Sequence, residues 1–237
     1  MNGNHGFHIA GELLQHILVG IVTDGNGNTY KGSVAATGTV RMIKLDIVGN
    51  FRDIGGRNTM YGGKIKYGMM YRSEELNAAK REGIEQLLDM GIGAEIDLRG
   101  MDQSISKFNF TVEDNTYYCA DLGEMEYYIY LTDKGKKMFK DELVFIVDNL
   151  KRGNAIHFHC TAGADRTGML GCMLYALLGC SEDDIYKDFE LTCFAGAPGR
   201  TKDEVDRRFM KYVRENFAGE TLNEKYEDFY INQAGVT

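Results

Sequence analysis

The residues best suited to chemistry stand close together in AIHFHCTAGADRTGML, residues 155–170 of this chain. An apolar run ends at His159 and Cys160, and five residues separate that cysteine from Arg166. An ionised cysteine is a strong nucleophile, and a planar guanidinium donates paired hydrogen bonds to phosphate or carboxylate oxygens. The spacing therefore indicates attack by Cys160 on an anionic group that Arg166 holds.

The predicted elements around these residues indicate their place in the fold. Residues 155–158 fit a central strand, and residues 166–179 fit a helix that Gly179 closes. The connecting loop then lies at the carboxyl end of a strand and the amino end of a helix, where open α/β folds bind ligands. Unpaired N–H groups and the helix dipole attract anions to such a place.

Small residues in the loop let several backbone N–H groups turn inward around an anion of phosphate size. We expect the loop to hold a substrate phosphate, or a phosphate or sulfate ion, through Thr161, Ala162, Gly163, Ala164 and Thr167. The same positive potential favours a thiolate, because it lowers the pKa of a cysteine below the free value of about 8.5. Thr167 is placed to hydrogen-bond the sulfur, and the ring of His159 to orient the loop.

The loop matches a known signature. His159, Cys160, Gly163 and residues 166–168 fit HCxxGxxR[ST]G, which is typical of cysteine-dependent protein tyrosine phosphatases. Rhodanese-like sulfurtransferases also use a cysteine loop, commonly a shorter one, so the spacing disfavours them. A buried cysteine beside a helix-capping loop would not require Arg, Gly and Thr together.

Further motifs extend the match along the chain. In order they are NFRDIGG (50–56), YRSEEL (71–76), IDLRG (96–100) and HCTAGADRTG (159–168). Together they resemble the bacterial tyrosine phosphatase family whose loop reads HCxAGKDRTG or HCxAGADRTG, over residues 45–235. The resemblance implies hydrolysis of phosphotyrosine, and in some members of phosphoserine, phosphothreonine or phosphoinositides. The implied partner is a phosphorylated protein or a small phosphomonoester.

The expected chemistry has two steps. Thiolate Cys160 attacks phosphorus while Arg166 and the loop amides hold the equatorial oxygens, and water then hydrolyses the phosphocysteine. The loop supplies the positive charge, so we expect no metal and no cofactor. Two alternatives stay open. One is a phosphoinositide or inositol phosphate phosphatase, which Ala164 disfavours because many members have Lys there. The other is a non-catalytic phosphate-binding module, which would lack a competent acid.

The leaving group needs a proton from a general acid. Asp165, inside the loop, is favoured over Asp121 on an upstream loop, because an aspartate at this loop position is typical of the family. The competing interpretation of Asp165 is a brace that pairs with a backbone N–H or an arginine. Asp133 is a third candidate, better suited to the first turn of a helix.

Charged residues at other strand ends are expected near the loop. Asp97 and Arg99 either support the loop or line the pocket, and structural ion pairing is as well founded as substrate contact. The same two interpretations apply to Arg52, Asp53, Arg72 and Ser73. The aromatic run 117–130 is interpreted as packing rather than as a pocket wall, and the loop 194–200 as part of a lid.

Strands that alternate with helices predict an α/β fold with a mostly parallel central sheet flanked by helices. Residues 1–40 predict a small β extension with a hairpin around TDGNGN, and residues 41–237 the phosphatase domain. The extension holds three histidines that are too scattered to predict a metal site, namely His5, His8 and His16.

Local patterns predict several elements more closely. They are a strand over 63–71, a helix over 77–90 with Asn77 as its cap, strands over 92–100 and 116–122, a helix over 132–150 capped by Thr132, and a helix over 181–192 capped by Ser181.

Composition limits the partners and the compartment. The chain has 237 residues and a formal charge of −8, which argues against nucleic acid as a partner. No apolar run approaches the roughly 18 residues that span a membrane. The five cysteines are odd in number and lack paired spacing, which argues against a disulfide framework. The start MNGNH lacks a signal-peptide pattern, so we expect a cytoplasmic protein, or an exported one whose leader was removed.

Overall fold

The fold is known from a computed structural model, and the structure describes residues 18–19, 21–23, 29–31, 48–100, 105–122, 127–195 and 197–236. The three histidines of the predicted extension, His5, His8 and His16, lie outside the described residues.

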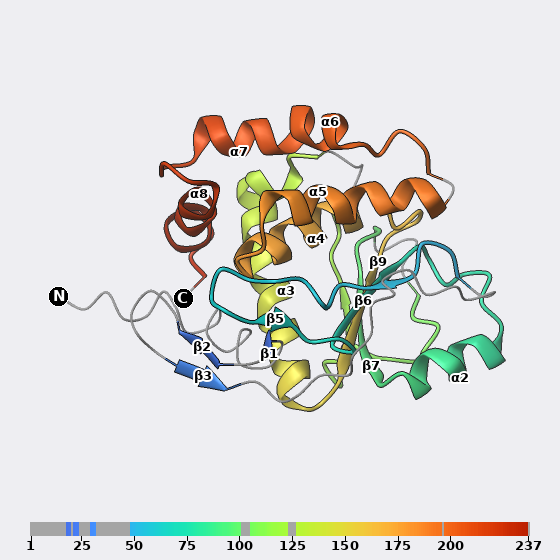
Figure 1. The fold of residues 1–237 in the computed structure, drawn as a ribbon. Coiled ribbons are helices and arrows are strands. Elements are labelled where there is room, and N and C mark those ends of the chain that lie inside the picture. Colours follow the sequence, from blue (N-terminus) through green and yellow to red (C-terminus); the bar gives the residue numbers. More distant parts are fainter. Residues whose placement is uncertain are drawn as a thin grey trace.

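A five-stranded sheet forms the centre of the molecule (Figure 1). Its strands in spatial order are β4 (Arg52–Asp53), β6 (Met70–Ser73), β9 (Ala155–His159), β7 (Ile92–Asp97) and β8 (Tyr117–Cys119). Only the pairing of β4 with β6 is antiparallel within this sheet; β6, β9, β7 and β8 run parallel. The predicted α/β fold with a mostly parallel sheet is confirmed.

The strand register aligns the ends of the parallel strands. Ser73 and Asp97 both pair with His159, and Asp97 also pairs with Cys119. The residues that follow these positions therefore leave the sheet side by side at its carboxyl edge. That edge is where α/β sheets bind their ligands.

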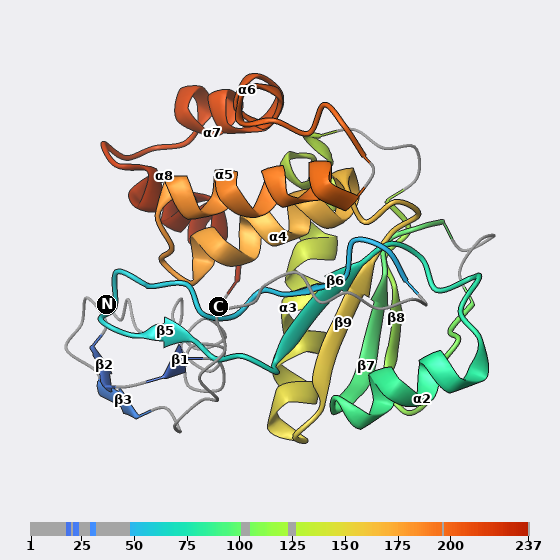
Figure 2. The same cartoon turned by 45° about the vertical axis from the view of Figure 1, so that its right-hand side comes forward.

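Helices cover both faces of the sheet. In Figure 2, α2 (Arg81–Asp89) lies in front of β7 and β8, whereas α3 (Asp133–Lys151) passes behind β9. Thr132 caps α3 as predicted, because its hydroxyl accepts the N–H of Gly135 at 3.1 Å. The helix after the loop is α4 (Asp165–Leu177), whose residues 167–177 are all buried, as in a helix enclosed on every side.

The C-terminal part forms an outer helical layer over α4 (Figure 1). Its helices are α5 (Glu182–Leu191), α6 (Lys202–Val205), α7 (Lys211–Asn216) and α8 (Leu222–Asp228). Short 3-10 turns occupy Ile129–Leu131 and Thr192–Ala195, and π-helical turns occupy Asp206–Met210 and Phe229–Gln233. Ser181 caps α5 as predicted, since its hydroxyl accepts the N–H of Asp184 at 3.1 Å.

Side-chain alternation along β9 decides on which face of the sheet Cys160 lies. Ile156, Phe158 and Cys160 belong to the large core cluster that includes α4 residues, whereas Ala155 belongs to the smaller cluster that includes Ile84 of α2. Cys160 thus lies on the sheet face that α4 covers, next to the loop that leads into that helix.

Two sequence predictions were wrong in detail. The predicted helix 77–90 begins only at Arg81, and Asn77 is no cap, because its Oδ1 accepts a hydrogen bond from Arg99 at 3.2 Å. The single strand predicted over 63–71 is divided into β5 (Lys64–Ile65) and β6. Gly68 between them has φ +77° and donates its N–H to Asp53 at 2.6 Å, which fixes a turn.

Two strands pair within the predicted N-terminal extension. β2 (Ile21–Thr23) and β3 (Thr29–Lys31) run antiparallel, and the predicted turn between them, at residues 24–28, lies outside the described residues. A further short strand, β1 (Leu18–Val19), pairs with β5 and so joins the extension to the main body. The domain boundary at residue 40 stays a prediction. Among the described residues, no helix combines the length and apolarity needed to cross a membrane.

Candidate active site

The loop between β9 and α4 begins with Cys160, which is 3% exposed. Gly163 at its middle has φ +62°, in the left-handed region that favours glycine. A Cβ atom on Gly163 would lie 2.3 Å from the backbone oxygen of Ser73 at the end of β6. The glycine therefore lets the loop turn tightly against the neighbouring strand.

The loop carbonyls point backward into the protein. The oxygens of Thr161 and Ala162 accept hydrogen bonds from Glu75 N–H at 3.1 Å and from the Asn50 amide at 3.1 Å. The Gly163 oxygen accepts two more, at 2.9 Å each, from Asn50 and Arg72. Because the N–H of a trans peptide points opposite to its carbonyl, the N–H groups of the residues that follow these carbonyls point away from the donors. N–H groups that share one direction in this way can bind an anion.

Arg166 and Thr167 follow the loop in the first turn of α4. The Arg166 guanidinium reaches across the loop, donating to the Leu98 oxygen and to the Thr161 hydroxyl, each at 3.3 Å. It is partly exposed, so an anion in the loop can contact it. The Thr167 hydroxyl is buried and has no hydrogen-bond partner among the described residues, and its expected contact with the cysteine sulfur stays a prediction.

Asp165 is bound by residues from two other segments. Its Oδ1 accepts the Tyr127 hydroxyl at 2.5 Å, and Arg200 donates to both carboxylate oxygens, at 3.1 and 2.6 Å. Burial raises the pKa of Asp165, but the hydrogen bonds from Arg200 and Tyr127 outweigh burial and lower that pKa below the ordinary value. The carboxyl is therefore ionised at neutral pH.

The other acid candidates lie at the surface. The Asp121 side chain is 50% exposed and pairs with Lys134 at 3.8 Å, and the Asp133 side chain is fully exposed at the start of α3. Asp165 adjoins Arg166 at the start of α4, whereas Asp121 and Asp133 are exposed and pair with Lys134 and Lys136. The choice of Asp165 as the general acid stays a prediction.

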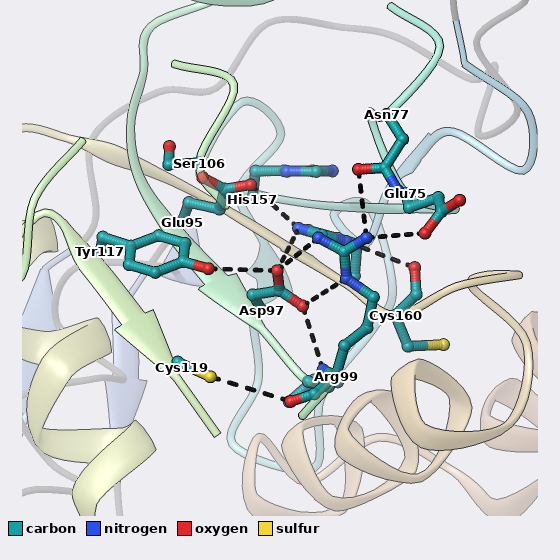
Figure 3. Close-up of polar contacts among 12 residues, drawn as sticks. Glu75, Asn77, Glu95, Asp97, Arg99, Ser106, Tyr117, Cys119, His157 and Cys160 are labelled. Atoms are coloured by element: carbon teal, nitrogen blue, oxygen red, sulfur yellow. Dashed lines mark hydrogen bonds and ion pairs between the residues drawn. The ribbon is translucent and has the colours of Figure 1, made fainter. Parts of the chain in front are cut away.

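Asp97 and Arg99 form a buried pair beside the loop (Figure 3). Arg99 donates to both carboxylate oxygens of Asp97, at 2.8 and 2.6 Å, and its other end reaches Glu75 at 2.6 Å. Burial raises the pKa of Asp97, but the hydrogen bonds from Arg99 outweigh it and lower that pKa. Figure 3 shows the Cys160 sulfur turned away from this cluster. The pair lies at the carboxyl end of β7, next to β9, and its supporting role at the loop stays a prediction.

His159 is hydrogen-bonded to a buried acid on the neighbouring strand, Glu95. Its Nε2 lies 2.9 Å from Glu95 on β7, and its Nδ1 lies 3.3 Å from the Cys160 oxygen. The stacked ring of His157 contacts the Ser73 hydroxyl at 2.7 Å. Glu95, His157 and His159 bring metal-type donor atoms within 4.8 Å of one another. We interpret the group as a hydrogen-bonded network, because two of its ring nitrogens already face Ser73 and Glu95.

Several residues at the site were missed in the sequence. Glu95 interrupts the apolar strand IGAEID, which is a detectable signal for a buried acid with a partner. Tyr127 lies in the aromatic run that was interpreted as packing, and Arg200 at the end of the loop that was interpreted as a lid. Asn50 precedes the RD pair in NFRDIGG, with φ +55°. No local pattern links these residues to the cysteine loop.

Two comparisons with known proteins both match this chain to tyrosine phosphatases. A family model described as "Tyrosine phosphatase family" matches residues 43–231. A curated protein of Cupriavidus necator, named "Putative tyrosine-protein phosphatase H16_A0669", is 24% identical to this chain over 171 residues. The alignment covers 62% of this chain and 61% of that relative, so the chain spans less than two thirds of the relative's length.

Proposed function

Because the chain belongs to the tyrosine phosphatase family, we propose that it hydrolyses phosphate monoesters, foremost phosphotyrosine, through a phosphocysteine formed on Cys160. One observation carries this proposal. Cys160 follows the central strand, at the start of a loop whose carbonyls accept hydrogen bonds from Glu75, Asn50 and Arg72 and whose Arg166 reaches the Leu98 oxygen and the Thr161 hydroxyl. That arrangement offers a nucleophile and an anion site to the same phosphorus atom.

In the first step, the Cys160 thiolate attacks phosphorus, an S–P bond forms, and the bond from phosphorus to the tyrosine oxygen breaks. The loop N–H groups and Arg166 hold the three equatorial oxygens. The leaving phenolate takes a proton from Asp165. In the second step, water attacks the same phosphorus, Asp165 accepts the proton of the water, and the S–P bond breaks. Inorganic phosphate leaves and the thiolate is restored.

Asp165 can act as the acid although its lowered pKa leaves the carboxyl of the free protein ionised at neutral pH. A bound phosphate dianion places negative charge next to the carboxylate, and a neighbouring like charge raises a carboxyl pKa. The substrate thereby favours the protonated form that the first step uses. Tyr127 and Arg200 hold the carboxyl in place, at 2.5 and 2.6 Å, while it gives up and regains this proton.

The test is phosphate release by wild-type protein and Cys160→Ser, with a metal chelator present throughout. The substrates are a phosphotyrosine peptide, a phosphoserine peptide and phosphoinositide vesicles. We expect turnover of phosphotyrosine that survives the chelator and falls by about 10³-fold or more in Cys160→Ser. The matched control is Cys180→Ser, a buried cysteine beyond the far end of α4, which should retain activity.

Two further readouts define the mechanism. Acid quenching of wild-type protein during turnover should trap phosphate on Cys160, located by peptide mass spectrometry. Activity that persists in Cys160→Ser would refute the cysteine mechanism. Phosphate binding without turnover on any of the three substrates would instead indicate a non-catalytic phosphate-binding module, and a preference for the vesicles would identify a phosphoinositide phosphatase.

A further inference from the structure

A buried cluster of charges lies behind the loop, away from its open side. Arg52 on β4 and Arg72 on β6 are both fully buried, and both pair with Asp188 of α5, at 3.1 and 2.6 Å. Burial raises the pKa of Asp188, but the charges of Arg52 and Arg72 outweigh it and hold that pKa well below the ordinary range. Two guanidinium cations therefore share one carboxylate, which leaves one positive charge.

The surplus charge is directed at the loop. Arg72 Nη1 binds Asp188, while its Nη2 donates to the Gly163 oxygen at 2.9 Å and approaches the Ala164 oxygen at 3.5 Å. Arg52 contributes indirectly, because it donates to Asn50, whose amide holds the oxygens of Ala162 and Gly163. A chain of buried donors thus runs from α5 to the backbone of the loop.

The helix after the loop has glycines where this guanidinium passes. A Cβ atom on Gly171 would lie 2.9 Å from Arg72 Nη1, and one on Gly168 would lie 2.9 Å from the Phe189 ring and 3.7 Å from Arg72 Nη2. A larger residue at Gly171 would push Arg72 away from Asp188 and the loop. Gly168, which the sequence signature requires, thereby acquires a physical role in α4.

We propose that Arg72 is a positioning residue of the phosphate loop. Asp188 holds Arg72, which fixes the direction of the Gly163 carbonyl through a hydrogen bond and places a positive charge on the carbonyl side of the loop. This inference rests on the proposed function and adds a residue that does not touch the substrate. A cation on the carbonyl side polarises the peptide units, so that their N–H groups bind an anion more strongly. At low local dielectric, the same charge also stabilises a thiolate in the loop.

The experiment measures the loop without relying on turnover. Iodoacetamide reacts with thiolates, so the pH at half-maximal alkylation of Cys160, followed by peptide mass spectrometry, reports ionisation. Cys193, half-buried and outside the loop, serves as the internal reference. In a second series on the Cys160→Ser background, calorimetry gives the affinity for inorganic phosphate.

Arg72→Gln removes the charge, and Arg72→Lys keeps it but loses the two-sided contact. We expect Arg72→Gln to raise the alkylation midpoint of Cys160 by about one pH unit and to weaken phosphate binding about tenfold or more. Arg72→Lys should recover much of the midpoint shift and little of the affinity. If Arg72 had a purely structural role, the alkylation midpoint would not depend on whether the substituted residue keeps the positive charge.

Arg57→Lys is the matched control, since Arg57 is also buried and pairs with Asp184 of the same helix at 2.6 Å. It should leave the midpoint and the affinity unchanged. If Arg72→Gln does not fold, Asn50→Gly decides. Glycine keeps the left-handed backbone and deletes the amide, so phosphate affinity should fall several-fold.

The proposal is overturned by a folded Arg72→Gln protein with wild-type midpoint and affinity, by equal shifts in Arg57→Lys, or by unchanged affinity in Asn50→Gly when Arg72→Gln is unfolded. Failure of the proposed function would look different. The wild-type protein would bind phosphate and show the Arg72 dependence, yet release no phosphate from any substrate.

Discussion

Arg200 grips both carboxylate oxygens of Asp165, although 35 positions separate the two residues and they belong to different segments. The pair links the loop before α6 to the loop that carries the cysteine. The Asp165 side chain is only 12% exposed, against 31% for Arg200, so the guanidinium covers the carboxyl from the solvent side. A displacement of Arg200 is therefore expected to change the pKa of the Asp165 carboxyl.

The role of Asp165 as general acid can be tested through the leaving group. We expect Asp165→Asn to lower kcat for phenyl phosphate by about 10²-fold or more, because phenolate leaves poorly without a proton. The loss with p-nitrophenyl phosphate should be much smaller, because that leaving group departs without protonation. Steady-state kinetics on the two esters measures the difference. Equal losses of kcat on both esters would indicate that Asp165 supports the loop and does not protonate the leaving group.

Arg200 should set the pH dependence of this acid. Because Arg200 lowers the pKa of Asp165, Arg200→Met should raise that pKa, and the protonated form should persist to higher pH. The alkaline limb of the kcat profile for phenyl phosphate is therefore expected to move to higher pH. Arg207→Met is the control, since Arg207 is an exposed arginine that pairs with Glu204. If the alkaline limb of the kcat profile does not move in Arg200→Met, the group that titrates there is not Asp165.

The tight turn at Gly163 predicts a sharp penalty for one methyl group. Gly163→Ala combines a left-handed backbone with a clash against Ser73, so we expect it to lose about 1–3 kcal/mol of unfolding free energy and its phosphate affinity. Gly153→Ala has the same backbone strain, at φ +87°, but meets no atom within 4 Å. Urea unfolding and calorimetry of the two variants separate the clash from the strain. Equal behaviour would show that the contact with β6 is unimportant.

Glu142 on α3 predicts a stability that depends on pH. It is fully buried beside the Tyr130 hydroxyl, at 3.0 Å, and burial raises its pKa well above the ordinary value. The folded state thus keeps a proton that the unfolded chain releases, so stability should fall as pH rises above the unfolded pKa of about 4.3.

Replacing Glu142 by a residue that does not ionise should stabilise the protein at high pH. We expect Glu142→Gln to raise Tm by about 2–4 °C at about pH 8, which is about 1 kcal/mol for a chain of this size, and to change it little at about pH 4. Glu85→Gln, at an exposed glutamate of α2 that pairs with Arg81, should show no such trend. A wild-type Tm that does not fall between these pH values would contradict the protonated state of Glu142.

The sequence was most informative where neighbours in the chain are also neighbours in space. Cys160 and Arg166 share one strand–loop–helix unit, and the caps Thr132 and Ser181 act within a few residues. These features follow from local backbone rules. Asn77 shows where such rules fail, because Arg99 competes for the side chain that would otherwise cap α2.

The rest of the site depends on partners far along the chain. Arg52 and Asp188 are 136 residues apart, and Asn50 and Gly163 are 113 apart. Burial of an arginine is a property of the finished fold, since on its own it would be unfavourable. A single sequence therefore indicated that Arg52 and Arg72 belong near the loop, and left ion pairing and substrate contact equally open.

The central position of β9 has a consequence for how the nucleophile survives thermal fluctuation. β6 and β7 cover both edges of this strand, so its amide hydrogens should exchange with solvent deuterium only when the whole sheet opens. Local openings at the surface, such as fraying of the last helices, leave Cys160 anchored. Cys160 thus directly follows the slowest-opening strand of the molecule, whereas Arg200, which binds Asp165, comes from a segment near the surface that can open sooner.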